Sequence, residues 1–414
     1  MQSPTLRVIY TLTKQSKAMA HTPIIKDLCD TDLYKFSMGQ VAFHQFPEVQ
    51  AVFRYTNRAK EKGYRAGFAV EVREQIEMMA DLCLTEQMFD YFRQRCPWIK
   101  LTYLQWLRQY RFNPEQVVLS QEGGELQVEV RGPWFETIYW EVPLLCIISE
   151  LSRTDPVTGA MLPRAFDWAD RITAKAEAMA AGGVHWIDFG TRRRFDYDTQ
   201  NEVCERMKQF APNFRGTSNP YLAMRHGINV FGTYAHELVM AMQALYGLPR
   251  SNERAMEHWV REYRGDLGIA LTDTLTTDVF LRSFDKFYAK LFDGVRQDSG
   301  CPFAVGEKYI AHYEKLGIDP RSKVIVFSDS LDTKKAIALA QCFKGRIKTT
   351  MGIGTHLTND VGHPAPNHVI KLVKLDCGNG PIPLLKLSDD VGKITGNESM
   401  VADAIRTLNI QPAE

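Results

Sequence analysis

The stretch VHWIDFGTRRR, residues 184–194, joins a short apolar strand, predicted over 184–189, to a polar loop. The same arrangement recurs further along the chain. Further strands are predicted over 229–232, 268–271, 294–297, 323–327 and 347–351. Helices are predicted between them over 199–210, 235–245, 276–284, 305–316 and 333–342. This alternation is typical of βαβ units with parallel strands, and six or more such units predict a barrel or a large doubly wound sheet.

The first part of the chain has a different, α+β texture. A strand is predicted over 51–55, and amphipathic helices over 73–83 and 85–95. Strands over 116–120 and 126–130 flank a Gly-Gly turn and predict a hairpin. Residues 137–151 predict a strand that runs into a buried helix. Near the end of the chain, segments 369–375 and 383–387 predict a second hairpin around 377–380.

Composition limits the function classes. The chain of 414 residues has 50 Lys and Arg against 49 Asp and Glu, for a net charge of +1. That balance argues against a bulk nucleic-acid binder and against a polybasic membrane binder. Eight cysteines are scattered without zinc spacing, which fits a reducing cytoplasm. No apolar run has the length of a membrane helix.

The expected organisation has four parts. Residues 1–21 are basic and have no acidic residue, and we expect a disordered or artefactual tail rather than a transit peptide. An N-terminal α+β domain is expected over 22–160 and an α/β barrel domain over 161–362. Residues 363–414 are expected to complete the fold with a hairpin and a tail.

Polar residues follow each predicted parallel strand. Arg192, Arg193 and Arg194 could clamp a carboxylate or a phosphate, since guanidinium offers a bidentate fork, or form a solvated turn. His236 could shuttle a proton or take up a phosphoryl group, although a structural histidine is the commoner case. Because the carboxyl ends of barrel strands form one face, these clusters predict a single site.

Two further clusters carry the same ambiguity. Asp298 and Asp329 could bind magnesium-bound phosphate or support a developing cation, or simply cap helices. The run Gly352-Ile353-Gly354-Thr355 could offer backbone N–H groups to a phosphate, or form a tight turn. The chain has no GxxxxGK[ST] motif of a Walker-type ATP site. Together the clusters suit transfer at a ribosyl carbon with diphosphate as the leaving group.

Six motifs, taken in order, resemble the nicotinate phosphoribosyltransferase family. The resemblance covers about residues 22–395. The motifs are TDLYK (31–35), DFGTRR (188–193), GTSN (216–219), GTYAHE (232–237), VRQDSG (295–300) and GIGT (352–355). The resemblance implies a type II phosphoribosyltransferase fold: an irregular α/β barrel with an N-terminal α+β domain, as a homodimer with sites shared at the subunit interface.

The resemblance also implies a reaction. Nicotinate and phosphoribosyl diphosphate would give nicotinate mononucleotide and diphosphate, in NAD salvage, with ATP hydrolysis coupled through a phosphohistidine. Magnesium and ATP are the implied cofactor and co-substrate, with magnesium carried on the diphosphate. No nucleic-acid or membrane partner is expected.

Residue roles carry over from the same motifs. Phe189 is expected to stack on the pyridine ring, with Tyr34 of a partner subunit on the other face. The phosphorylated residue would be His236, with Asp298 and Glu237 as further catalytic residues. Lys35 is a further phosphate contact. The remaining expected substrate contacts are Arg192, Arg193, Ser218, Arg296, Asp329, Ser330, Gly352, Gly354 and Thr355.

Alternatives within and outside the fold stay open at this point. Nicotinamide-using relatives are the nearest competitor, but the pair Arg192 and Arg193 favours an acid substrate. Quinolinate-using relatives are shorter and lack the His236 motif. A catalytically inactive, nucleotide-binding barrel is the alternative from another class. Ser330 departs from the family pattern, since relatives often have glycine there.

Overall fold

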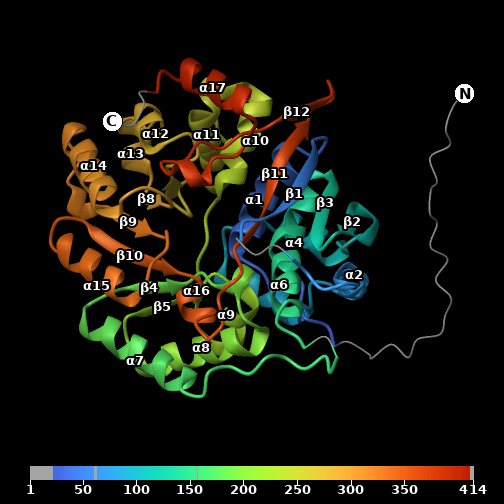
Figure 1. Ribbon diagram of the computed structural model, residues 1–414. Helices are drawn as coiled ribbons and strands as arrows, with labels where there is room; N and C mark the ends of the chain where they lie inside the picture. The colour runs from blue at the N-terminus through green and yellow to red at the C-terminus, as the bar shows by residue number, and fades with distance from the viewer. Residues whose placement is uncertain (1–21, 60–62, 156, 411–414) are drawn as a thin grey trace, which may run out of the picture.

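The computed structural model describes residues 22–59, 63–155 and 157–410, and within them the strands form two sheets (Figure 1). The antiparallel sheet has the order β12-β11-β1-β3-β2 and the parallel sheet the order β6-β5-β4-β10-β9-β8-β7. The antiparallel strands are β1 (Gln50–Asn57), β2 (Val117–Glu122), β3 (Glu125–Pro133), β11 (His368–Asp376) and β12 (Pro381–Pro383). The parallel strands are β4 (Trp186–Asp188), β5 (Phe214–Thr217), β6 (Asn229–Val230), β7 (Ile269–Leu271), β8 (Gly294–Gln297), β9 (Val324–Phe327) and β10 (Lys348–Ile353).

Helices accompany both sheets. In the first part of the chain they are α1 (Leu33–Gln45), α2 (Phe68–Met78), α3 (Glu86–Arg95), α4 (Leu101–Gln109), α5 (Trp134–Thr137) and α6 (Glu141–Leu151). In the second part they are α7 (Trp168–Ala181), α8 (Tyr197–Phe210), α9 (Pro220–His226), α10 (His236–Tyr246), α11 (Ser251–Tyr263), α12 (Thr277–Ser283), α13 (Lys286–Leu291), α14 (Pro302–Lys315), α15 (Thr333–Cys342), α16 (Thr355–Thr358) and α17 (Glu398–Thr407). No helix in the described residues is both long and apolar enough to span a bilayer.

The parallel strands follow the cyclic order of a barrel. On one side of β4 the sheet continues through β5 and β6. On the other side it continues through β10, β9, β8 and β7, so that the last parallel strand, β10, pairs with the first, β4. A doubly wound sheet would not close back in this way, so the barrel prediction is confirmed. The seam lies between β6 and β7, which are not paired as strands. Thr233, just after β6, bridges this seam by donating from Oγ1 to the carbonyl of Ile269 in β7 (3.0 Å).

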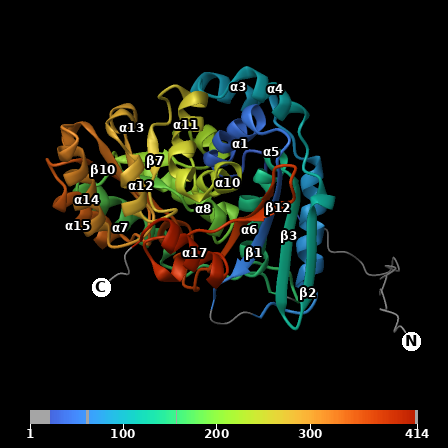
Figure 2. The ribbon, with the colours of Figure 1, turned by 90° about the horizontal axis from the view of Figure 1, so that it is seen from above.

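The antiparallel sheet joins distant parts of the chain. Strand β11 pairs with β1 along its whole length, although more than three hundred residues separate them (Figure 1). Figure 2 shows this sheet on one side of the molecule, with α7, α14 and α15 on the other. Both predicted hairpins are present, but the last strand, β12, begins two residues before the predicted segment 383–387 and covers only its first residue.

The structure differs from the predicted strands at two places. The segment 137–151 contains no strand: α5, a 3₁₀ turn and α6 follow one another, and every residue of α6 is buried. Periodicity cannot separate such an apolar run from a buried strand. Strand β5 was missed, because it has only four residues, FRGT, and one of them is glycine, which is depleted in strands. Its Gly216 is needed because a Cβ there would lie 2.0 Å from the Asn229 carbonyl oxygen in β6.

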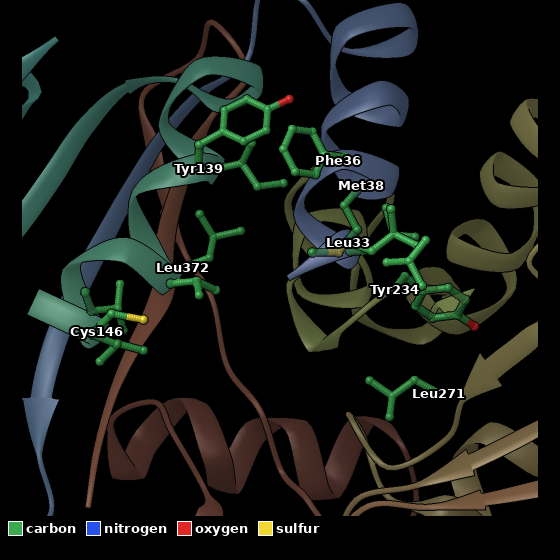
Figure 3. Close-up of a cluster of buried hydrophobic side chains, with 14 of the residues drawn as sticks. Leu33, Phe36, Met38, Tyr139, Cys146, Tyr234, Leu271 and Leu372 are labelled. Atoms are coloured by element: carbon green, nitrogen blue, oxygen red, sulfur yellow. The ribbon is translucent and has the colours of Figure 1, made fainter. Parts of the chain in front are cut away.

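One continuous apolar core connects the two sheets. Figure 3 shows Leu33, Phe36 and Met38 of α1 in the middle of this core, between Tyr139 and Leu372 on one side and Tyr234 and Leu271 on the other. Helix α1 is therefore held by both sheets, and its first residue lies at the barrel mouth, where the Leu33 N–H donates to the Ser218 carbonyl (2.7 Å).

Candidate active site

Two adjoining cavities lie at the carboxyl ends of the parallel strands. The larger has a volume of about 850 Å³ and the smaller about 140 Å³. The two cavities share a set of lining residues, namely Phe189, Arg192, His236, Arg296 and Asp298. The predicted strand-end clusters are thus brought together at one edge. A separate groove on the outer face of β1, β2 and β3 holds none of the predicted site residues.

The smaller cavity has aromatic walls from a single chain. Phe189 follows β4, and Tyr34 lies in the first turn of α1; both line this cavity together with Ser218. The chain's own Tyr34 thus lines this cavity, and the contribution of Tyr34 from a partner subunit stays a prediction. The chain's own Tyr34 lies at the cavity because α1 packs against the loop after β6. There, a Cβ on Gly232 would lie 2.9 Å from the Tyr34 nitrogen.

Buried hydrogen bonds fix the turn that carries Phe189. Asp188, at the end of β4, accepts bonds from the Gly190 N–H, from Gln200 and from Thr217, each at 2.8 Å. Burial raises the pKa of Asp188 to about 6. The Phe189 ring then packs on β10, where a Cβ on Gly352 would approach it to 2.4 Å. Gly352 thus makes room for Phe189 as well as lining the larger cavity.

The three consecutive arginines have three different surroundings. Arg192 lines both cavities, and its side chain is 40% exposed. Arg193 lines the larger cavity and donates to the His368 carbonyl of β11 at 3.0 and 3.2 Å. Arg194 is fully buried and pairs with Asp30 and Glu150. Only the first two are therefore available to a ligand.

His236 begins α10 at the junction of the cavities. Its Nδ1 lies 2.9 Å from the Thr274 hydroxyl, and its Nε2 lies 3.1 Å from Asp298 Oδ2 and 2.9 Å from the Lys386 ammonium. Burial and the charge of Lys386 lower the pKa of His236 to about 4. The imidazole is therefore neutral at pH 7, with a lone pair available to an electrophile.

Glu237, the residue after His236, is not part of the cavity lining. It is buried and accepts bonds from Lys35 (2.6 Å) and from Trp134 Nε1 (2.7 Å). Glu237 points away from the cavities because successive helical residues point about 100° apart, and its catalytic role stays a prediction. The fully buried ammonium of Lys35 pairs with Glu141 and Glu237, and its contact with phosphate stays a prediction.

Asp298 is the central carboxylate of the site. It accepts a bond from the Ser328 hydroxyl (2.9 Å), and its Oδ2 lies 3.5 Å from Arg296 Nη2. Burial alone would raise the pKa of Asp298, but Arg296 and His236 outweigh it and hold the pKa well below its usual range. Asp298 is therefore ionised at neutral pH.

The remaining predicted residues line the larger cavity after β9 and β10. They are Asp329, Ser330, Gly352, Gly354 and Thr355. Asp329 pairs with Lys393, whose ammonium also donates to the Asp298 carbonyl (2.8 Å). Ser330 has a φ of 48°, in the left-handed region that glycine occupies most readily, which fits the glycine expected there.

Among the residues that the structure describes, one group of side chains could hold a metal ion. His236, Asp273 and Asp298 each place a ligand atom within 4.8 Å of the others. The Lys386 ammonium already lies among them, 3.6 Å from Asp273 Oδ2 and 2.9 Å from His236 Nε2. Asp298, which is ionised and lines both cavities, is the member best suited to a magnesium ion carried by a ligand.

Two family models match the chain. The nicotinate phosphoribosyltransferase (NAPRTase) family matches residues 184–410, and the NAPRTase N-terminal domain matches residues 29–149. The chain belongs to the nicotinate phosphoribosyltransferase family. The first model includes the strand-end loops after β4, β6, β8, β9 and β10, and the second includes α1 with Tyr34.

Named relatives cover almost the whole chain. The nicotinate phosphoribosyltransferase of Chromohalobacter salexigens is 41% identical over 387 residues, 93% of this chain and 98% of the relative. The protein of that name from Photorhabdus laumondii is 42% identical over 394 residues, 93% of this chain and 96% of the relative.

Solved structures of the nicotinate phosphoribosyltransferase family have the same fold. The enzyme from Porphyromonas gingivalis superposes with a TM-score of 0.90 at 39% identity, covering 94% of this chain and all of that one. The enzyme from Vibrio cholerae gives 0.86 at 35% identity, covering 94% and 95%. The expected type II phosphoribosyltransferase architecture is thereby confirmed.

Four cationic side chains at the site were not predicted from the sequence. They line the larger cavity and are Arg58, Lys371, Lys386 and Lys393. Arg58 follows β1, Lys371 lies in β11, and the other two lie beyond β12. The available signal was Lys371 and Lys386 within the apolar stretches 369–375 and 383–387, because a charge in a buried apolar segment calls for a partner.

Proposed function

We propose that this protein joins nicotinate to phosphoribosyl diphosphate, yielding nicotinate mononucleotide and diphosphate for NAD salvage. The observation that carries the proposal is the smaller cavity, with Phe189, Tyr34 and Arg192 in its lining, opening onto a larger cavity lined by cations. Relatives named for this activity cover nearly the full chain.

The base would bind in the smaller cavity. Its ring would stack against Phe189 and Tyr34, and its carboxylate would pair with Arg192. The pyridine nitrogen then forms a bond to C1′ of the ribose as the bond from C1′ to the diphosphate oxygen breaks. The ionised Asp298 would face the positive charge that develops at C1′.

The larger cavity would hold the phosphates and the ribose. Gly354 and Thr355 would meet the 5′-phosphate through the backbone, and Asp329 and Ser330 would meet the ribose. The cations Arg58, Lys371 and Lys386, with Arg193 and Arg296, would surround the diphosphate. Asp298 would hold a magnesium ion on the diphosphate, and this ion neutralises the charge of the leaving group.

ATP would act through His236. A neutral imidazole nitrogen would form a bond to the γ-phosphorus as the bond to ADP breaks, and water would later release phosphate. The phosphohistidine would add negative charge between the two cavities, beside Lys386. We propose further that the expected homodimer carries a complete base pocket in each subunit, because Tyr34 and Phe189 come from one chain.

The test is product formation from phosphoribosyl diphosphate and magnesium. Nicotinate or nicotinamide is offered, each with and without ATP. Nicotinate mononucleotide, with its rate raised by ATP, is expected. Turnover of nicotinamide alone would overturn the assignment of the base, and no turnover of either would favour an inactive nucleotide-binding barrel. In His236→Asn, persistence of the ATP stimulation would overturn the role of His236.

Arg192→Ala tests the recognition of the acid group. Loss of the guanidinium should lower kcat/KM for nicotinate. The activation free energy that kcat/KM reports should rise by about 2–5 kcal/mol, because the carboxylate of the bound nicotinate loses its charged partner. Arg164→Ala is the control, since Arg164 pairs with Glu202 and lines neither cavity. Unchanged nicotinate kinetics in Arg192→Ala would remove this assignment.

A further inference from the structure

The carboxylate of Glu141 faces two ways. Glu141 is the first residue of α6, and its side chain is 11% exposed. One oxygen, Oε2, pairs with the ammonium of Lys35. The other, Oε1, lies 3.5 Å from the Tyr34 hydroxyl and 3.7 Å from Arg192 Nη1. Glu141 lines neither cavity itself, but it contacts two residues that line the smaller one.

Lys35 ties this carboxylate to the rest of the site. Its ammonium, which is fully buried, pairs with both Glu141 and Glu237. Glu237 lies in the first turn of α10, next to His236, and its second oxygen accepts a bond from Trp134. Glu141 is therefore held in place from α1 and, through Lys35, from α10.

Arg192 supplies a second cation to this group. Two buried carboxylates share the single ammonium of Lys35, which leaves one negative charge uncompensated. In the described part of the chain, the ion pair of Arg192 is the one with Glu141. Removing charge from Glu141 would break the ion pair that holds the Arg192 side chain, which is 40% exposed.

We propose that Glu141 is a positioning residue that orients Arg192 and Tyr34 for the base. By holding one guanidinium nitrogen, Glu141 leaves the remaining N–H groups of Arg192 for the carboxylate of the substrate. By facing the Tyr34 hydroxyl, it sets the position of that ring at the cavity wall. This inference rests on the proposed function, since it requires nicotinate as the substrate.

The test is Glu141→Gln in the full-length chain, with steady-state kinetics for both substrates. We expect KM for nicotinate to rise about tenfold, while kcat and KM for phosphoribosyl diphosphate change less than about twofold. A purely structural role would not separate the two KM values. Glu262→Gln is the control, because Glu262 is also a buried, paired glutamate and lines neither cavity.

Three outcomes would overturn the inference. An unchanged KM for nicotinate in a folded Glu141→Gln protein would do so, and so would an equal rise of both KM values. If Glu141→Gln does not fold, Glu141→Asp keeps the charge but withdraws it by one methylene, and it should still raise KM for nicotinate; an unchanged value overturns the inference. Failure of the unmodified protein to use nicotinate would instead refute the proposed function itself.

Discussion

At the scale of single residues, Lys371 has an unusual charge environment. Burial, and after it Arg58 and Lys386, lowers the pKa of Lys371 to about 7. Lys371 is therefore charged below pH 7 and loses its charge above it, so it favours anion binding only on the acid side. We predict that KM for phosphoribosyl diphosphate rises by about tenfold between pH 6 and pH 8.5.

The control for this prediction is Lys371→Arg. A guanidinium stays charged over the whole range, so the variant should show a flatter profile. The substrate's own phosphates titrate identically with both proteins, so the difference between the two profiles isolates the lysine. Parallel profiles would contradict the assignment of the lowered pKa.

Ser330 carries backbone strain that glycine would relieve. Its φ of 48° lies in the left-handed region, which costs an L-residue roughly 1–2 kcal/mol. We predict that Ser330→Gly raises the free energy of unfolding by about 0.5 kcal/mol in urea titration, after the greater entropy of glycine in the unfolded chain is subtracted. Ser330→Ala keeps the Cβ and should show no gain; equal stability of the two variants would contradict the explanation.

Residues close behind a strand could be predicted, and residues brought in by folding could not. Phe189, Arg192 and Asp298 follow strands in the sequence, so their meeting at one edge was predictable from the βαβ pattern. Lys386 comes from a segment beyond the other sheet, and no local pattern links it to His236. Glu237 is adjacent to His236 in the sequence, but its side chain bonds to Lys35 and Trp134 and lines neither cavity.

At the scale of elements, β10 makes room for the Phe189 ring because Gly352 has no side chain. A Cβ on Gly352 would lie 2.4 Å from the Phe189 ring, so Gly352→Ala should push that ring toward the smaller cavity. We predict a several-fold higher KM for nicotinate and a stability loss of about 1–3 kcal/mol. Gly63→Ala is the control, since an added Cβ there meets nothing within 4 Å. Unchanged nicotinate kinetics in Gly352→Ala would show that the ring has no such role.

Most elements could be predicted because their periodicity is strong. Helix α8 and strand β9 follow the sequence pattern within two residues. Several helices were not predicted, among them α1, α4, α7, α11 and α17. Two further exceptions have physical reasons: α6 is buried on all sides, so its apolar run lacks a polar face, and β5 is short and holds a glycine. The pairing of β1 with β11 depends on tertiary structure that no short window of sequence contains.

At the scale of the whole molecule, helix α17 supports the site from outside the barrel. Leu385 and Leu387, on either side of Lys386, pack in a small apolar core with Ala404 and Leu408. We predict that a chain ending at residue 397 melts at a lower temperature and loses most of its turnover, because Lys386 is no longer held beside His236. Thermal denaturation and the product assay measure both effects. A truncated chain with full activity would contradict this coupling.

The pairing of β1 with β11 has a consequence for how the protein is made. On the ribosome, β1 emerges early, but its partner β11 follows only on the order of tens of seconds later. Until then, one edge of β1 is an open template for strands of other nascent chains. Because Lys371 lies in β11 itself, the catalytic cavity is completed in the last stage of synthesis. Prematurely terminated chains should therefore be both inactive and prone to aggregate.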